Sequence, residues 1–159
     1  MVICPGGAYC MCSERESEPV ALQFLAQGFN AFVITYSTAS HQFPTQLREV
    51  AALMELIYEN ADSWNCNTSK IAIMGFSAGG HLAAHYSTAY DCEEVREVFP
   101  ESKAVNASVL CYPVITADPA HAHLGSFYNL LGKKEITEQD VKKYSCDRLV
   151  KENTPPAFI

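Results

Sequence analysis

Ser77 is the residue whose neighbours most strongly indicate chemistry. It lies in the stretch GFSAG (residues 75–79), which fits the pattern G-x-S-x-G and directly follows the apolar residues 71–74. In that pattern a serine at a sharp strand-to-helix turn exposes its hydroxyl as a nucleophile, and small neighbours prevent steric clashes. The alternative is a glycine-lined helix start with Ser77 as its N-cap. We predict that Ser77 is a catalytic nucleophile whose turn is supported by Gly75, Gly79 and Gly80.

A second glycine-rich stretch, PGGA at residues 5–8, follows the short apolar run at 2–4. Acyl transfer passes through a tetrahedral intermediate, and each backbone N–H aimed at its oxyanion contributes about 3–4 kcal/mol to the barrier. In nucleophile-elbow folds one donor is the residue after the serine, here Ala78, and another comes from a loop after an earlier strand. The loop at 5–8 is therefore predicted to help form an oxyanion hole.

The elements that must position these two stretches alternate along the chain. Five strands are expected. One begins at Val2, three span residues 31–36, 71–74 and 107–112, and the last begins at Ala157. A capping box of Ser13 and Glu16 predicts the start of a helix that ends at Gly28. Further helices are expected from Pro44 and over residues 78–88, 124–131 and 138–144.

Strict alternation of strands and helices predicts an α/β fold with a doubly wound, mostly parallel sheet and helices on both faces. Ligands of such sheets bind at the carboxyl ends of the strands. Because both glycine-rich turns directly follow strands, we expect them to lie on the same rim of the sheet.

The chain also resembles the esterase/lipase group of α/β-hydrolases, which includes acetyl-esterase and carbohydrate-esterase-like enzymes. The resemblance implies an acyl-enzyme at Ser77 and hydrolysis of small, short-acyl carboxylic esters, acetylated sugars among them. By position it implies Gly7 and Ala8 as oxyanion donors beside Ala78, provided that Ala8, where relatives often have glycine, has ordinary backbone angles. The stretches that carry it are ICPGGAY (3–9), EPVALQFLAQGFNAFVITYS (18–37), IAIMGFSAGGHLAA (71–84), CYPVIT (111–116) and TPPAFI (154–159).

The resemblance further implies that a catalytic acid and then a histidine follow the nucleophile. In that order both partners would come after Ile159, so residues 1–159 are expected to be a single, partial α/β-hydrolase domain without its first strands. An internal alternative uses Asp118 with His121 or His123. Residues 113–145 are expected to form a cap or substrate-covering segment. His81, one turn into the helix after Ser77, is expected to pack rather than to catalyse.

Other functions remain open at the level of the sequence. The same turn also serves peptidases and lactone hydrolases, and a domain without its acid and histidine could be a non-catalytic, hydrolase-like binding domain. Ester and peptide substrates, and a fluorophosphonate probe of Ser77, would separate these alternatives.

Composition narrows the class of partner. A chain of 159 residues with 48% hydrophobic residues suits one globular domain, and its net charge of -7 argues against nucleic acid or an anionic membrane as a partner. No apolar run approaches the roughly 20 residues that span a bilayer. Seven scattered cysteines indicate free thiols and a cytoplasmic location. No metal or organic cofactor is implied, and an exposed sheet edge predicts a homo-oligomer.

Overall fold

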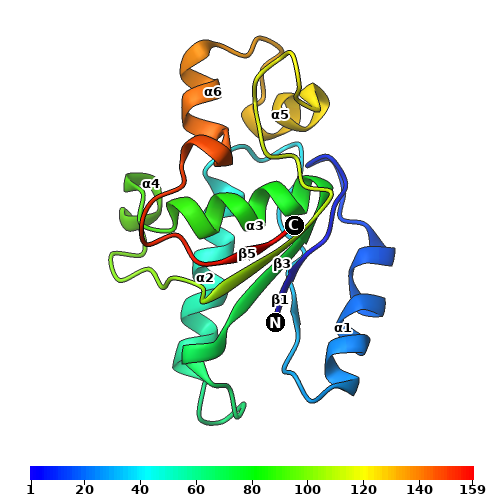
Figure 1. Cartoon of the computed structure of the whole chain (residues 1–159), viewed down its shortest axis with the longest axis vertical. Coiled ribbons are helices and arrows are strands. Elements are labelled where there is room, and N and C mark those ends of the chain that lie inside the picture. The colour runs from blue at the N-terminus through cyan, green and yellow to red at the C-terminus, as the bar shows by residue number, and fades with distance from the viewer.

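The computed structural model describes all 159 residues and contains a five-stranded sheet with the order β2-β1-β3-β4-β5 (Figure 1). All four strand pairings are parallel. This arrangement confirms the predicted α/β fold. The strands are β1 (Val2–Cys4), β2 (Phe32–Val33), β3 (Ala72–Phe76), β4 (Ala107–Cys111) and β5 (Ala157–Phe158).

Six α-helices and three short 3-10 helices connect the strands. The predicted helices at 124–131 and 138–144 have the expected bounds, whereas the short helix α4 was not predicted. The α-helices are α1 (Glu18–Ala26), α2 (Thr45–Glu59), α3 (Ser77–Ala89), α4 (Glu93–Arg96), α5 (Leu124–Leu131) and α6 (Glu138–Tyr144). The 3-10 helices are η1 (Glu14–Glu16), η2 (Thr68–Lys70) and η3 (Cys146–Arg148).

Successive residues of a strand point to opposite faces of the sheet. Both faces therefore carry apolar side chains, and helices cover both. Val2 and Ile73 belong to the large core that includes the buried faces of α2 and α3. Ile3 and Phe76 instead pack with Ala21 of α1 in a smaller core. Figure 1 shows α1 on one side of the sheet and α2 and α3 on the other. The doubly wound architecture follows from this two-sided packing.

The strand order reverses between β1 and β3. The chain runs from β1 outward to β2 and then returns to place β3 on the other side of β1. Such a reversal leaves a crevice at the carboxyl ends of the two strands, where ligands bind in open α/β sheets. The loop after β1 carries Gly6 and Gly7, and β3 leads directly into Ser77. The two predicted stretches therefore meet at the reversal point.

Two local predictions differ from the structure. The strand expected at 31–36 is paired only at Phe32–Val33, because it lies at the edge of the sheet beside a β1 of three residues. The predicted capping box does not form either. Ser13 makes no side-chain cap, and α1 begins at Glu18. The carboxylate of Glu16 instead accepts the N–H of Gly6.

Residues 113–145 contain α5 and α6, which lie beyond the carboxyl ends of the strands in Figure 1. The segment thus lies at the end of the sheet where the crevice opens, and its role as a cover stays a prediction. None of the helices combines the length and the apolar character that crossing a bilayer requires.

Candidate active site

Ser77 is the first residue of α3 and directly follows β3. Its φ of 51° lies in the left-handed region, which costs a residue with a Cβ about 1–2 kcal/mol. The side chain is half-buried and its hydroxyl makes no hydrogen bond within the protein. The N-terminus of α3 favours negative charge that develops beside this hydroxyl. Ser77 therefore has the backbone and the location of a nucleophile rather than those of a simple N-cap, since Phe76 occupies the N-cap position.

The glycines around Ser77 lie too close to neighbouring backbone to carry a side chain. A Cβ on Gly75 would stand 2.1 Å from the carbonyl oxygen of Gly79, and a Cβ on Gly79 would stand 2.1 Å from that of Cys4. A Cβ on Gly80 would meet Pro113 at 2.8 Å. The sharp turn from β3 into α3 thus depends on glycine at these positions.

The loop after β1 has an unusual backbone in which three consecutive residues have positive φ. The angles are 134° at Gly7, 53° at Ala8 and 58° at Tyr9. Ala8 therefore lacks the ordinary backbone angles on which its predicted role as an oxyanion donor depended, and any such role must be played from this left-handed conformation. Its conformation is one that glycine adopts without strain, which explains in physical terms why glycine suits this position.

Each carbonyl oxygen from Pro5 to Ala8 accepts a hydrogen bond from a residue further along the chain. Such bonds over-determine the loop and maintain its left-handed residues. The donors are the Tyr36 hydroxyl to Pro5 at 2.6 Å, the Ser13 N–H to Gly6 at 2.9 Å, the Cys10 N–H to Gly7 at 2.9 Å, and the Asn129 side-chain amide to Ala8 at 2.8 Å.

The N–H groups of the same loop divide into one that is occupied and two that are free. The N–H of Gly6 donates to the Glu16 carboxylate at 2.8 Å. The N–H groups of Gly7 and Ala8 donate to no acceptor in the protein. A Cβ on Gly6 would lie 3.2 Å from the Cβ of Ser77, so the loop passes directly beside the nucleophile. Gly7 and Ala8 directly follow Gly6, so the loop beside Ser77 carries two unbonded donors of the kind that an oxyanion requires.

A pocket of about 430 Å³ opens in front of Ser77. Its wall is formed by the chain after β4 and by the loop before α5. Besides Ser77, the lining residues are Tyr112, Pro113, Val114, Ile115, Thr116, His121, Ala122 and His123. The pocket therefore lies between the nucleophile and the predicted covering segment.

The two predicted histidines line this pocket with Ser77 but do not hydrogen-bond to it. His121 Nδ1 lies 3.7 Å from Asp118 Oδ2, and both side chains are well exposed. His123 Nδ1 instead shares a 2.9 Å hydrogen bond with the hydroxyl of Ser126. The structure thus brings His121 and His123 to the pocket of Ser77 without a hydrogen bond to it, whereas Asp118 lines a different pocket.

His81 is buried behind the turn at Ser77, and both of its ring nitrogens make hydrogen bonds there. Its Nε2 donates to the carbonyl of Tyr144 at 2.9 Å, and its Nδ1 accepts from the Tyr9 hydroxyl at 2.7 Å. Burial lowers the pKa of His81 to about 4, although the hydrogen bond to Tyr144 partly opposes that shift. His81 is therefore a neutral structural residue, in keeping with its predicted role in packing.

Sequence reasoning missed Tyr112, which lines the pocket, and the contact that Glu16 makes with it. Tyr112 has a φ of 36°, and its hydroxyl donates to Glu16 Oε1 at 2.8 Å. No local motif marks this contact, because the partners are separated by most of the chain. A tyrosine directly before Pro113 at the end of a strand was the available signal, and it indicates only where the strand ends.

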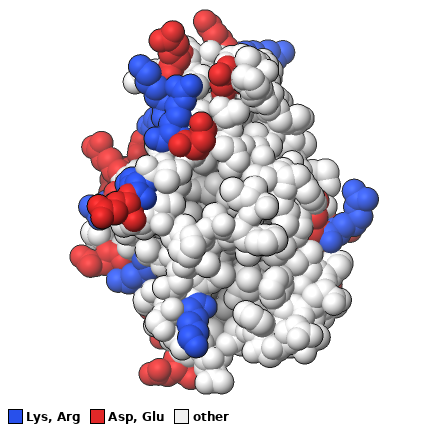
Figure 2. Space-filling model, viewed as in Figure 1, with Lys and Arg blue, Asp and Glu red and all other residues white.

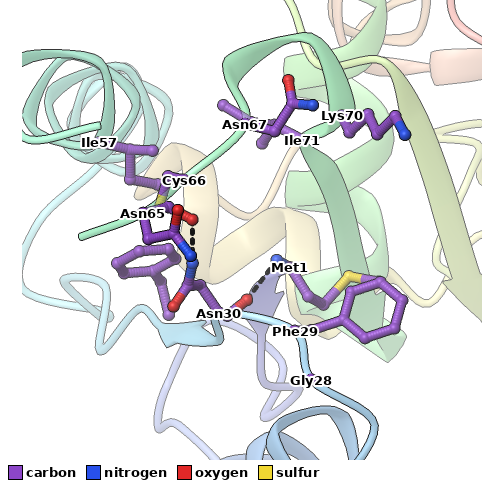
Figure 3. A pocket seen from close by; sticks show the side chains of 11 residues that line it. Met1, Gly28, Phe29, Asn30, Ile57, Asn65, Cys66, Asn67, Lys70 and Ile71 are labelled. Atoms are coloured by element: carbon purple, nitrogen blue, oxygen red, sulfur yellow. Dashed lines mark hydrogen bonds between the residues drawn. The ribbon is translucent and has the colours of Figure 1, made fainter. Parts of the chain in front are cut away.

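A second pocket, of about 240 Å³, lies at the amino ends of the strands (Figure 3). There the Met1 amino group donates to the Asn30 carbonyl, and the Asn30 side chain donates to the carbonyls of Trp64 and Asn65. Neither serine nor histidine lines this pocket, and it lies across the sheet from the turn at Ser77. The predicted nucleophile and both predicted histidines line the pocket at the carboxyl ends instead. No cluster of three or more metal-ligating side chains occurs in the molecule.

A model of the BD-FAE family matches residues 1–159, the whole chain. The chain belongs to the BD-FAE family. Members of this family have the α/β-hydrolase fold, and its relatives include acetylxylan esterases and carboxylesterases. The predicted resemblance to α/β-hydrolase esterases is thereby confirmed.

Named relatives of this BD-FAE chain include a xylanase, an acetylxylan esterase and a carboxylesterase. It is 34% identical to an acetylxylan esterase of Xylanibacter ruminicola over 98% of its length, and 36% identical to endo-1,4-beta-xylanase B of Butyrivibrio fibrisolvens over 100%. An acetyl ester-xyloside bifunctional hydrolase of Caldicellulosiruptor lactoaceticus is 33% identical over 99% of the chain, with a TM-score of 0.86. A Lactobacillus plantarum carboxylesterase, Cest-2923, is 28% identical over 99% of the chain, with a TM-score of 0.80.

The chain is shorter than all of these relatives. It covers 26% of the xylanase and 31% of the acetylxylan esterase. It covers 58% of the Caldicellulosiruptor hydrolase and 57% of Cest-2923.

Proposed function

We propose that this BD-FAE chain carries the nucleophile and oxyanion hole of a serine hydrolase for small carboxylic esters, with acetylated sugars as its substrate class. The observation that carries the proposal is the left-handed Ser77 beside Gly6, in a loop whose next two N–H groups, those of Gly7 and Ala8, are unbonded. The names of the relatives, which include an acetylxylan esterase and an acetyl ester-xyloside hydrolase, support the substrate class.

In the proposed reaction Ser77 Oγ attacks the acyl carbon while its proton passes to a general base. The carbonyl oxygen becomes an oxyanion, which accepts hydrogen bonds from the N–H groups of Gly7, Ala8 and Ala78. Collapse of the tetrahedral intermediate returns the proton to the alcohol, which leaves, and an acyl-enzyme remains. Water then attacks the acyl carbon, and the reverse transfers release the carboxylic acid and restore Ser77.

The general base has two candidate sources. His121 is the better internal candidate, because its Nδ1 faces Asp118 while that of His123 is bonded to Ser126. The family order of nucleophile, acid and histidine instead favours a histidine after residue 159. His121→Ala in the full-length gene product separates these sources. An internal base predicts a loss of at least 10³-fold in kcat, and a later histidine predicts retention of most activity.

A fluorophosphonate probe tests the nucleophile directly. The full-length gene product should be labelled, whereas Ser77→Ala should not be, and Ser87→Ala is the matched control because Ser87 is buried within α3 and its hydroxyl bonds to Ala83. Absence of labelling in the full-length product would contradict the proposed function and favour a non-catalytic binding domain.

Rates on matched substrates test the bond that is cleaved. The proposal expects faster hydrolysis of p-nitrophenyl acetate and of an acetylated xyloside than of the corresponding amide or of a lactone. A preference for the amide or the lactone would assign the same nucleophile to peptidase or lactonase activity.

A further inference from the structure

Tyr112 is held in a conformation that a bulky residue rarely adopts. Its φ is 36°, while 67% of the residue's surface is exposed. A positive φ destabilises a residue with a large side chain. Burial of the ring does not offset this cost at Tyr112, because the ring is mostly exposed. Strain of this kind persists where surrounding contacts enforce it, and it concentrates at functional sites.

Three contacts enforce the position of Tyr112 relative to the nucleophile. The N–H of Val114 donates to the carbonyl of Ser77 at 3.1 Å, which joins the chain after β4 to the elbow. Pro113 packs where Gly80 has no side chain. The ring of Tyr112 lies 5.9 Å from that of Phe76, tilted by 52°. The ring is therefore fixed at the mouth of the pocket that Ser77 lines.

Glu16 connects this ring to the oxyanion loop. Its Oε1 accepts the Tyr112 hydroxyl at 2.8 Å, and its Oε2 accepts the Gly6 N–H at 2.8 Å. A carboxylate offers about four acceptor positions, so two remain for a ligand. An exposed aromatic face with a polar edge, next to a carboxylate that accepts hydrogen bonds, suits a neutral polyol: the ring packs on C–H groups and the carboxylate accepts from hydroxyls.

We propose that Tyr112 and Glu16 form the subsite that binds the sugar alcohol of the ester, which is the leaving group of the acylation step. This inference rests on the proposed esterase function and names the part of the substrate that this side of the pocket recognises. The negative charge of Glu16 selects neutral hydroxyl-rich alcohols over anionic ones.

Two substrates separate the subsite from the chemistry at Ser77. For the full-length gene product we compare kcat/KM for p-nitrophenyl acetate, which has no sugar, with kcat/KM for an acetylated methyl xyloside. Tyr112→Ala should lower kcat/KM for the xyloside at least tenfold more than for the aryl ester, mainly through KM. Tyr112→Phe keeps the ring and loses the hydroxyl. It should lower kcat/KM for the xyloside about threefold more than kcat/KM for the aryl ester. Tyr90→Phe is the control, because Tyr90 lies at the far end of α3 and should leave both rates unchanged.

Equal losses on both substrates, or no loss on either, would overturn the proposal. Binding of methyl xyloside, followed by saturation-transfer NMR, gives a readout that does not depend on turnover. If the wild type hydrolyses no ester, the proposed function fails. Binding that is lost in Tyr112→Ala and weakened about threefold in Tyr112→Phe would still support the subsite, and a wild type that binds no xyloside would overturn it.

Discussion

Strained residues are concentrated around the proposed nucleophile. Five non-glycine residues have positive φ, and four of them, Ala8, Tyr9, Ser77 and Tyr112, lie at the carboxyl ends of β1, β3 and β4. The fifth, Asn65, lies near the opposite end of the sheet. Each such residue costs of order 1–3 kcal/mol, so their gathering at one rim is a structural sign of function that does not depend on any motif.

Ala8 offers a direct test of this strain. Ala8→Gly should stabilise the protein by about 0.5–1 kcal/mol, because relief of a left-handed Cβ exceeds the extra backbone entropy of glycine when unfolded. Urea denaturation measures the free energy of unfolding.

The same substitution at Ala52 is the matched control for Ala8→Gly. Ala52 is exposed within the right-handed helix α2, so Ala52→Gly should destabilise by roughly 0.5–1 kcal/mol. Two changes of the same sign would show that the backbone of Ala8 is not strained in solution.

At the scale of elements, α5 reaches from the covering segment to the oxyanion loop. The Asn129 side chain donates to the Ala8 carbonyl at 2.8 Å, across most of the length of the sequence. A helix of the predicted covering segment therefore helps to hold the loop that contains the unbonded N–H groups of Gly7 and Ala8.

Asn129→Ala should lower kcat for p-nitrophenyl acetate about tenfold and change KM less than twofold. The expected loss is confined to kcat because the oxyanion donors act most strongly in the transition state. Steady-state kinetics of the full-length gene product measure both constants, with the exposed Asn153→Ala as control. A change in KM alone would place Asn129 in substrate binding instead.

The sequence predicts elements better than it predicts contacts between distant segments. Residues 124–131 and 138–144 show helical periodicity. The start of α6 is fixed by a capping box between Thr137 and Asp140, which are neighbours in the sequence. Glu16 shows the opposite case. Its spacing from Ser13 is that of a capping box, but the carboxylate bonds to Gly6 and Tyr112, which only the folded sheet brings near. Ser77 and its glycines could be found because the elbow is a local structure; Tyr112 could not.

At the scale of the whole molecule, His81 joins three distant parts of the chain. It bonds to Tyr9 in the loop after β1 and to Tyr144 at the end of α6, while it belongs to α3 itself. Both bonds in this arrangement require a neutral ring, because Nδ1 must accept. Burial also holds the pKa of neighbouring His85 well below its ordinary value.

Stability should therefore fall as the pH drops from about 6.5 toward 4. In this pH window His81 and His85 are protonated in the unfolded chain but remain neutral in the folded protein. Each contributes up to about 1.4 kcal/mol per pH unit, and the contribution is complete above pH 6.5. Urea denaturation between pH 7 and pH 4.5 measures the slope.

Two variants assign this pH dependence. His121→Ala, at an exposed position, should leave the slope unchanged, whereas His81→Phe should be less stable at pH 7 but have a shallower slope. A slope that His81→Phe does not reduce would show that other groups cause the acid sensitivity.

The outer edge of β5 is unpaired, because β5 is the last strand of the sheet and pairs only with β4. Phe158 and Ile159 are 74% and 80% exposed, and Figure 2 shows few charged side chains on the face that carries this strand. Unpaired strand edges of this kind associate with other chains. Self-association through β5 stays a prediction, which sedimentation velocity of wild type and Phe158→Lys would test; a monomeric wild type would contradict it.

The reversal of strand order between β1 and β3 also has a consequence for the newly made protein. Cys4 pairs with Gly75, so the loop at Gly7 and the turn at Ser77 come together only when strands from distant parts of the chain have joined. Pairing of distant strands is a slow and cooperative part of folding. A nascent or partly folded chain therefore contains every residue of the proposed oxyanion hole yet cannot assemble it. On the proposed function, Ser77 gains its oxyanion donors only when β1 and β3 have paired.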